Sequence, residues 1–160
     1  MKKYPVLPMW QPWASLCIIN NPNTGKPWKT VETRSYPLPA TLLEETVLIY
    51  ACKKWDSKQE NFARELSKIR DLDYGTYPLG KIIGSVKMLY SGKIIEKSGK
   101  FYLDGCYGEV DGTEKLLGDY RPGRYGWLMG DNSRLSYPIP FRCHQGINYF
   151  ETDIDFDLPF

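Results

Sequence analysis

The 160-residue sequence has little of what metal centres, exported proteins and membrane proteins need. It holds one histidine, His144, and its four cysteines lie far apart with no C-x-x-C pair, which argues against a zinc site. No stretch approaches the ~20 apolar residues of a membrane span, and the N-terminus lacks the apolar run of a signal peptide. We therefore expect a cytoplasmic protein with no metal and no cofactor, whose cysteines are reduced and mostly buried.

Internal repeats and low-complexity segments are also missing, and 42% hydrophobic with 25% charged residues is typical of a folded domain. The length predicts one domain over 1–160. The formal net charge is only +2, but residues 151–160 contain four acidic residues and no Lys or Arg, so the rest of the chain is moderately basic. That distribution permits a polyanionic partner without requiring one.

The order of apolar patterns predicts a mixed α/β (α+β) domain with a central sheet. The segment 46–52 is almost continuously apolar, as in a strand buried on both faces, and Gly84 within a later strand indicates a bulge or a close backbone approach. A glycine-rich, hairpin-like excursion is expected around 91–118. The remaining expected strands are 29–34, 81–90, 125–129 and an acidic C-terminal strand 151–160, and the expected helices are 12–19 and 57–70.

The segment 29–34 concentrates an amine, a carboxylate and a guanidinium in Lys29, Glu32 and Arg34. On a regular strand Glu32 and Arg34 share one face, and Lys29 joins them only if the chain bends, which Pro27 upstream would allow. One interpretation is a half-exposed strand with a surface ion pair that contributes at most about 1 kcal/mol. The other is a ligand site, in which the two cations donate to phosphate or a base carbonyl while Glu32 accepts from an exocyclic amine.

A loop at 119–124 carries Arg121 and Arg124 between two tyrosines. Guanidinium groups bind phosphate and aromatic rings stack on bases, so this loop is the second candidate for a nucleic-acid contact. A simple exposed turn is the alternative interpretation.

Four blocks of sequence resemble the ASCH domain family when they are taken together and in order. They are residues 11–15, 29–35, 83–86 and 138–146, and they span most of the chain. The resemblance implies a fold similar to the PUA domain, a small β-barrel with flanking helices. It also implies a cleft beside the second block that binds RNA or a nucleotide-like ligand.

By this resemblance, Lys29, Glu32 and Arg34 are the lysine, glutamate and arginine of the family's G-x-K-x-x-E-x-R signature. Pro27 takes the place of its glycine, and Cys143 stands where relatives often have glycine. The side chains expected to line the cleft beside the signature are Gln11, Trp13, Trp127 and Gln145. The tryptophans are candidates for stacking walls, although a tryptophan is more often a core residue.

The first functional hypothesis is therefore a module that binds single-stranded RNA or a nucleotide-like ligand. The alternative is a small hydrolase acting on a modified nucleoside or RNA, with Lys29 and Glu32 as catalytic residues. Amidohydrolases of the family have a threonine nucleophile where this sequence has Glu32, so their mechanism would lose its hydroxyl. A protein-interaction module is the second alternative, and it predicts that the three charges are solvated and separately dispensable.

Overall fold

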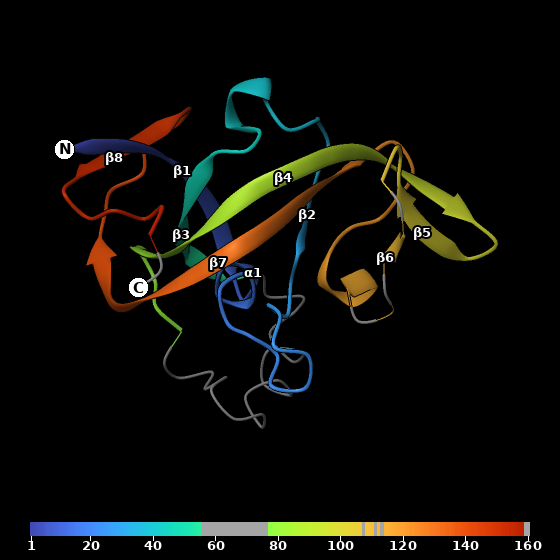
Figure 1. The fold of residues 1–160 in the computed structure, drawn as a ribbon, viewed down its shortest axis with the longest axis horizontal. Coiled ribbons are helices and arrows are strands. Elements are labelled where there is room, and N and C mark those ends of the chain that lie inside the picture. The colour runs from blue at the N-terminus through green and yellow to red at the C-terminus, as the bar shows by residue number, and fades with distance from the viewer. Residues whose placement is uncertain (56–76, 107, 111, 113, 159–160) are drawn as a thin grey trace.

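The computed structural model describes residues 1–55, 77–106, 108–110, 112 and 114–158, and these are built mostly from β-strands (Figure 1). Helical structure within them is limited to one four-residue α-helix and two short 3-10 segments. The elements in chain order are β1 (Lys2–Gln11), α1 (Trp13–Leu16), β2 (Val31–Arg34), η1 (Ala40–Leu42), β3 (Thr46–Trp55), β4 (Lys81–Lys97), β5 (Lys100–Leu103), β6 (Glu109–Val110), η4 (Glu114–Leu117), β7 (Tyr125–Pro140) and β8 (Asn148–Thr152).

The main sheet has the strand order β2-β7-β4-β3-β1-β8, with β1 and β3 parallel and the other pairs antiparallel. Three strands separate β2 from β1 in this order. Nevertheless, the Arg34 guanidinium donates from Nη2 to the Pro8 carbonyl oxygen at 3.1 Å, which joins β2 to β1 directly. The sheet therefore curls into a half-barrel, and the side chains of β2 help to close it.

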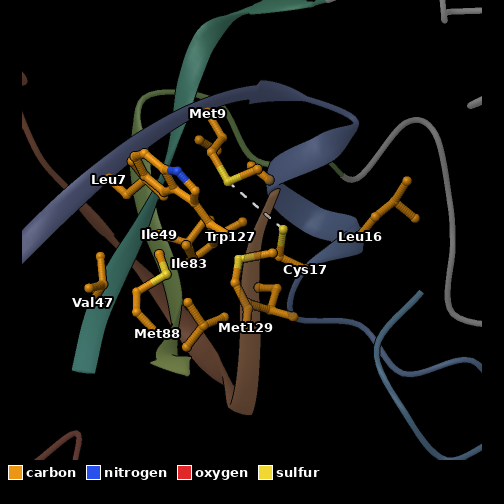
Figure 2. Packing of buried hydrophobic residues seen from close by; sticks show 14 of the residues in the cluster. Leu7, Met9, Leu16, Cys17, Val47, Ile49, Ile83, Met88, Trp127 and Met129 are labelled. Carbon is orange, nitrogen blue, oxygen red and sulfur yellow. Dashed lines mark hydrogen bonds between the residues drawn. The ribbon is translucent and has the colours of Figure 1, made fainter. Parts of the chain in front are cut away.

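The principal core lies inside this curl, and Figure 2 shows its central side chains from α1 and the strands. Strand β3 alternates between two cores, because Val47 and Ile49 face the inner cluster while Leu48 and Tyr50 pack in the outer one. The prediction of a strand at 46–52 buried on both faces is confirmed. The outer cluster is covered by aromatic side chains after β7 and in the C-terminal segment, among them Phe156.

In the N-terminal part of the chain, one strand was not predicted and one predicted helix needs correction. Residues 2–11 form β1, although Pro5 and Pro8 argue against a strand in the sequence because neither has an N–H donor. The helix expected over 12–19 ends at Leu16, since the backbone N–H groups of Ile18 and Ile19 both turn back to the Ser15 carbonyl. The helix expected at 57–70 lies outside the described residues.

Strands predicted at 81–90 and 125–129 are present and longer than expected, as β4 and β7. Gly84 is a point of close backbone approach, as predicted, because a Cβ atom there would collide with the Ser133 carbonyl oxygen. Beyond the barrel, β4 continues into a hairpin with β5, and β6 pairs with β5, so paired strands occur within the 91–118 segment.

The C-terminal strand is shorter than the alternation in 151–160 predicts, since β8 ends at Thr152. Ile154 is exposed where the alternation requires burial. Beyond β8 the chain leaves the sheet, and Asp155 and Asp157 accept hydrogen bonds from Lys2 Nζ at 2.7 and 3.2 Å. The helices among the described residues are all too short to cross a membrane.

Candidate ligand-binding site

Lys29 lies just before β2, where the chain bends, and its side chain is only 2% exposed. Its ammonium donates to the carbonyl oxygens of Val31 and Leu117, both at 2.6 Å. The third direction faces Glu32, whose Oε2 lies 3.6 Å away. The bend at the start of β2 therefore brings Lys29 to Glu32, and the ammonium is surrounded by acceptors.

Glu32 and Arg34 lie on the same face of β2, with Arg34 Nε donating to Glu32 Oε1 at 3.0 Å. The guanidinium lies 5.6 Å from the centre of the Trp127 ring, within reach of a cation–π contact. The Glu32 side chain is 12% exposed and that of Arg34 is 26% exposed. This burial contradicts both the surface ion pair and the solvated charges that a protein-interaction module predicts.

Glu114 is a member of this cluster that the sequence reasoning missed. From η4 its carboxylate accepts hydrogen bonds from the backbone N–H of Thr30 at 3.0 Å and of Val31 at 2.8 Å, and from the Thr30 hydroxyl at 3.1 Å. Burial raises the pKa of the Glu114 carboxyl, with the positive charge of Lys29 and these hydrogen bonds opposing the rise. Nothing in the sequence around Glu114 signals a partner 84 residues away.

A cavity of about 230 Å³ opens beside these side chains. Trp13 from α1 is one of its walls, and the Lys29 ammonium lies 5.8 Å from the centre of the Trp13 ring. The described residues that line it are Trp13, Lys29, Glu32, Thr33, Leu116, Leu117, Gly118 and Asp119. Two carboxylates, one ammonium and an aromatic ring therefore meet in a space smaller than the pockets of drug-sized ligands, which span about 300–1,000 Å³.

The wall made by η4 and the residues after it is fastened to β2 at several points. The Asp119 N–H donates to Thr33 Oγ1 at 2.9 Å, and Lys29 holds the Leu117 carbonyl. Arg124 donates to the Asp119 carbonyl at 3.0 Å and to the Thr33 carbonyl at 3.1 Å. Because the wall is held by backbone and side-chain bonds together, the cavity is already formed in the free chain.

The two arginines of the 119–124 loop differ in their surroundings. Arg124 is largely committed to the backbone bonds that hold the loop against β2, and its side chain is 25% exposed. Arg121 is 78% exposed and pairs with Asp119, its Nε donating to Oδ1 at 2.8 Å. Tyr120, which precedes Arg121, is buried at 5% exposure, and of the two arginines Arg121 is the one largely exposed to solvent.

Four predicted ligand-binding residues are not part of the cavity lining. One is Arg34, which bonds to Glu32 of the lining, and the other three are Gln11, Trp127 and Gln145. Gln11 is fully buried, where it donates to Ser15 Oγ and accepts from the Ser15 N–H, which ties β1 to α1. Trp127 is 1% exposed in the inner core, and its indole N–H donates to the Tyr36 carbonyl at 3.1 Å. Gln145 is exposed in the segment between β7 and β8, and β8 stands at the opposite end of the strand order from β2.

A larger groove of about 830 Å³ has Glu114 and Thr30 among its lining residues. Its walls come from the loop before β2 and from the middle of β7, with Trp28 and Lys26 on one side and Asn132 on the other. Glu114 lines this groove and not the smaller cavity, and its carboxylate holds the backbone N–H groups of Thr30 and Val31.

The cysteines and the histidine have no part in the cavity lining. Burial raises the pKa of the Cys17 thiol and, less strongly, that of Cys143 to about 11. Over the described ranges, no three His, Cys, Asp or Glu side chains are grouped so that they could hold a metal ion. His144 is exposed, and its backbone N–H donates to Asn148.

No family model matches the chain, and no curated protein does. Among solved structures, it is similar to crystal structures of the ASCH protein from Zymomonas mobilis. The first of these has 18% identity and a TM-score of 0.47, and covers 94% of this chain and 89% of that chain. The structure of a serine-to-alanine variant has 18% identity and a TM-score of 0.47, and covers 92% of this chain and 88% of that chain. The structure of a tyrosine-to-phenylalanine variant has 19% identity and a TM-score of 0.47, and covers 94% of this chain and 91% of that chain.

Proposed function

We propose that this protein is a binding module for single-stranded RNA or a nucleotide-like ligand, and that the cavity beside β2 receives one base. The observation that carries the proposal is the buried Glu32 carboxylate, fixed by Lys29 and Arg34 and lining a cavity beside the Trp13 ring. The ASCH-like motifs, and the PUA-like barrel they imply, support the same class of ligand. The half-barrel is the scaffold that holds these groups in place.

The chemistry of the cavity suits a base better than a whole nucleotide. A carboxylate accepts hydrogen bonds from the N–H groups of a base edge, and an aromatic ring offers a face on which any base can stack. The volume of about 230 Å³ leaves the sugar and the phosphates outside. Arg121, which is exposed and paired with Asp119 of the lining, is a cation that an emerging phosphate can contact.

The geometry of Lys29 favours binding over hydrolysis. A lysine acting as a general base must direct a lone pair at a substrate proton. The N–H groups of Lys29 are instead directed at two carbonyl oxygens at 2.6 Å, and Glu32 lies on the remaining side. Lys29 is thus used as a fixed cation that orients Glu32, which is a role in binding.

The proposal is tested by titrating the protein with nucleosides, nucleotides and short single-stranded RNA at two salt concentrations, following tryptophan fluorescence. We expect saturable quenching, with the RNA signal weakened by salt because phosphate contacts release counterions. Mass spectrometry of the mixtures checks that no product forms. Absence of saturable binding with every one of these ligands would contradict the proposal.

Glu32→Gln is the informative variant, since it keeps the size of the side chain and removes its charge. It should weaken binding about tenfold or more, because a hydrogen bond to a charged group contributes about 1.5–3 kcal/mol. Glu96→Gln, at an exposed position of β4 away from the cavity lining, is the matched control and should bind as the wild type does. Thermal unfolding of both variants separates lost binding from lost folding.

A further inference from the structure

The cavity beside β2 offers acceptors to a ligand and few donors. The Glu32 carboxylate receives one hydrogen bond from Arg34 and faces Lys29 at 3.6 Å. A carboxylate has about four acceptor positions, so Glu32 retains capacity for two more donors. The Lys29 ammonium, the one cation among the described residues of the lining, is already bonded to two carbonyl oxygens.

Asp119 adds a second carboxylate to the same lining. Its hydrogen bonds with the Arg121 side chain lower the pKa of the Asp119 carboxyl, so the group is ionised at neutral pH. The described lining thus carries two carboxylates and one engaged ammonium, while Arg34 and Arg121 pair with the carboxylates from outside the lining. Because the ammonium is engaged and Glu32 keeps free acceptor positions, the cavity suits a ligand that brings N–H donors of its own.

The four RNA bases differ in what they present to a carboxylate. The unpaired Watson–Crick edge of guanine carries two adjacent donors, the N1–H and the exocyclic amine, which match the two oxygens of one carboxylate. Adenine and cytosine each place a single amine beside a ring-nitrogen acceptor. Uracil places one N–H between two carbonyl oxygens, which a carboxylate repels.

We propose that the cavity is selective for guanine as an unpaired base, with Glu32 accepting from both donors of its Watson–Crick edge. The selectivity deepens the proposed function and rests on it. Pairing in a duplex would occupy the same edge, so a single strand or a loop is the form of RNA in which the base can enter. Lys29 and Arg34 are the positioning residues that aim the carboxylate.

The test compares five nucleosides on the wild-type protein: guanosine, inosine, adenosine, cytidine and uridine. Inosine is the matched ligand, because it retains the N1–H of guanosine and lacks only the exocyclic amine. We expect guanosine to bind about tenfold to a hundredfold more tightly than inosine, the effect of one hydrogen bond to a charged acceptor. Adenosine, cytidine and uridine should bind more weakly than guanosine.

Glu32→Gln supplies a second measurement, since an amide presents one acceptor and one donor in place of two acceptors. It should lower the ratio of guanosine to adenosine affinity, and the wild-type series decides the question even if this variant unfolds. Equal affinity for guanosine and inosine, or tighter binding of another base, would overturn the guanine selectivity while leaving the binding module standing. If no nucleoside or RNA binds, the proposed function itself fails.

Discussion

Two clusters of charged side chains, one inside the half-barrel and one at the chain ends, use the same residue types in different surroundings. The β2 charge cluster joins Lys29, Glu32, Arg34 and Glu114, with Lys29 only 2% exposed. The terminal charge cluster joins Lys2 to Asp155 and Asp157 at 2.7 and 3.2 Å, with the Lys2 side chain 51% exposed. The distances between the charged atoms do not distinguish the two clusters.

Burial makes the difference between them. Water solvates the terminal charge cluster whether or not its partners meet, so its ion pairs contribute little to stability. Inside the barrel, each charge of the β2 charge cluster depends on its partners, since an uncompensated buried charge costs several kcal/mol. The comparison indicates that the β2 charge cluster is a structural closure of the barrel as well as the wall of a binding cavity.

The largest expected effect is that of Lys29→Met, which removes the cation and keeps much of the side-chain volume. Glu32 then loses one of its two cationic partners, and the carbonyl oxygens of Val31 and Leu117 lose their donor. We expect the free energy of unfolding to fall by about 3–5 kcal/mol. Urea-induced unfolding measures it, and a fall no larger than that of a surface pair would break the comparison.

Arg34→Lys should have the next largest effect. A lysine keeps the positive charge but cannot reach Glu32 Oε1 and the Pro8 carbonyl together, as the planar fork of Arg34 does. The expected loss is about 1.5–3 kcal/mol in urea-induced unfolding. Arg121→Lys is the matched control at an exposed arginine, and it should leave the unfolding midpoint unchanged. Equal effects of the two substitutions would mean that the bond to β1 does not close the barrel.

Glu114→Gln should change stability by about 1 kcal/mol at neutral pH, because it loses hydrogen bonds while relieving a buried charge. Its clearer signature is the dependence on pH. Since burial raises the pKa of Glu114 above the ordinary 4.5, this group makes the free energy of unfolding fall as pH rises from 4.5 through the raised pKa. The variant should lack that fall.

The measurement for Glu114 is urea-induced unfolding of both proteins between pH 4.5 and 7. Aspartates with lowered pKa values, Asp119, Asp155 and Asp157, act with the opposite sign and below about 3.8, outside this window. A wild-type slope that persists unchanged in the variant would assign the pH dependence to another group.

Lys2→Gln should have the smallest effect. It removes the cation between Asp155 and Asp157, but all three side chains remain in contact with water. We expect the urea midpoint to stay within experimental error of the wild type at moderate salt. A loss that approaches that of Lys29→Met would show that exposure does not separate the two clusters.

The sequence predicts the parts of the structure that depend on local patterns. The apolar run 46–52 predicts β3 because both faces of that strand are buried, and the composition of 29–34 predicts β2. The prolines of β1 argue against a strand in the sequence. The pairing with β3 and β8 that accommodates them depends on segments distant in the chain. The sequence likewise does not predict the role of Glu114, since its partners are the backbone N–H groups of Thr30 and Val31.

For the candidate site, the sequence identifies the charged residues and leaves their accessibility open. The cavity brings together Lys29, Glu32 and Trp13. These residues are close in the sequence, so their meeting could be predicted. Gln11 and Trp127 belong to the same region, but their polar groups bond within the protein. Whether a polar side chain bonds inward or faces a cavity depends on packing between elements, which spacing in the sequence does not encode.

The central claim is that the cavity beside β2, and not the larger groove at Trp28, receives the ligand. The most direct measurement is a titration of ¹⁵N-labelled protein with guanosine, following the indole N–H signals of the tryptophans and the backbone amide of Gly118. The claim predicts shifts at Trp13 and Gly118, with Trp10 and Trp28 unchanged. A shift confined to the Trp28 indole N–H would place the ligand in the groove and contradict the claim.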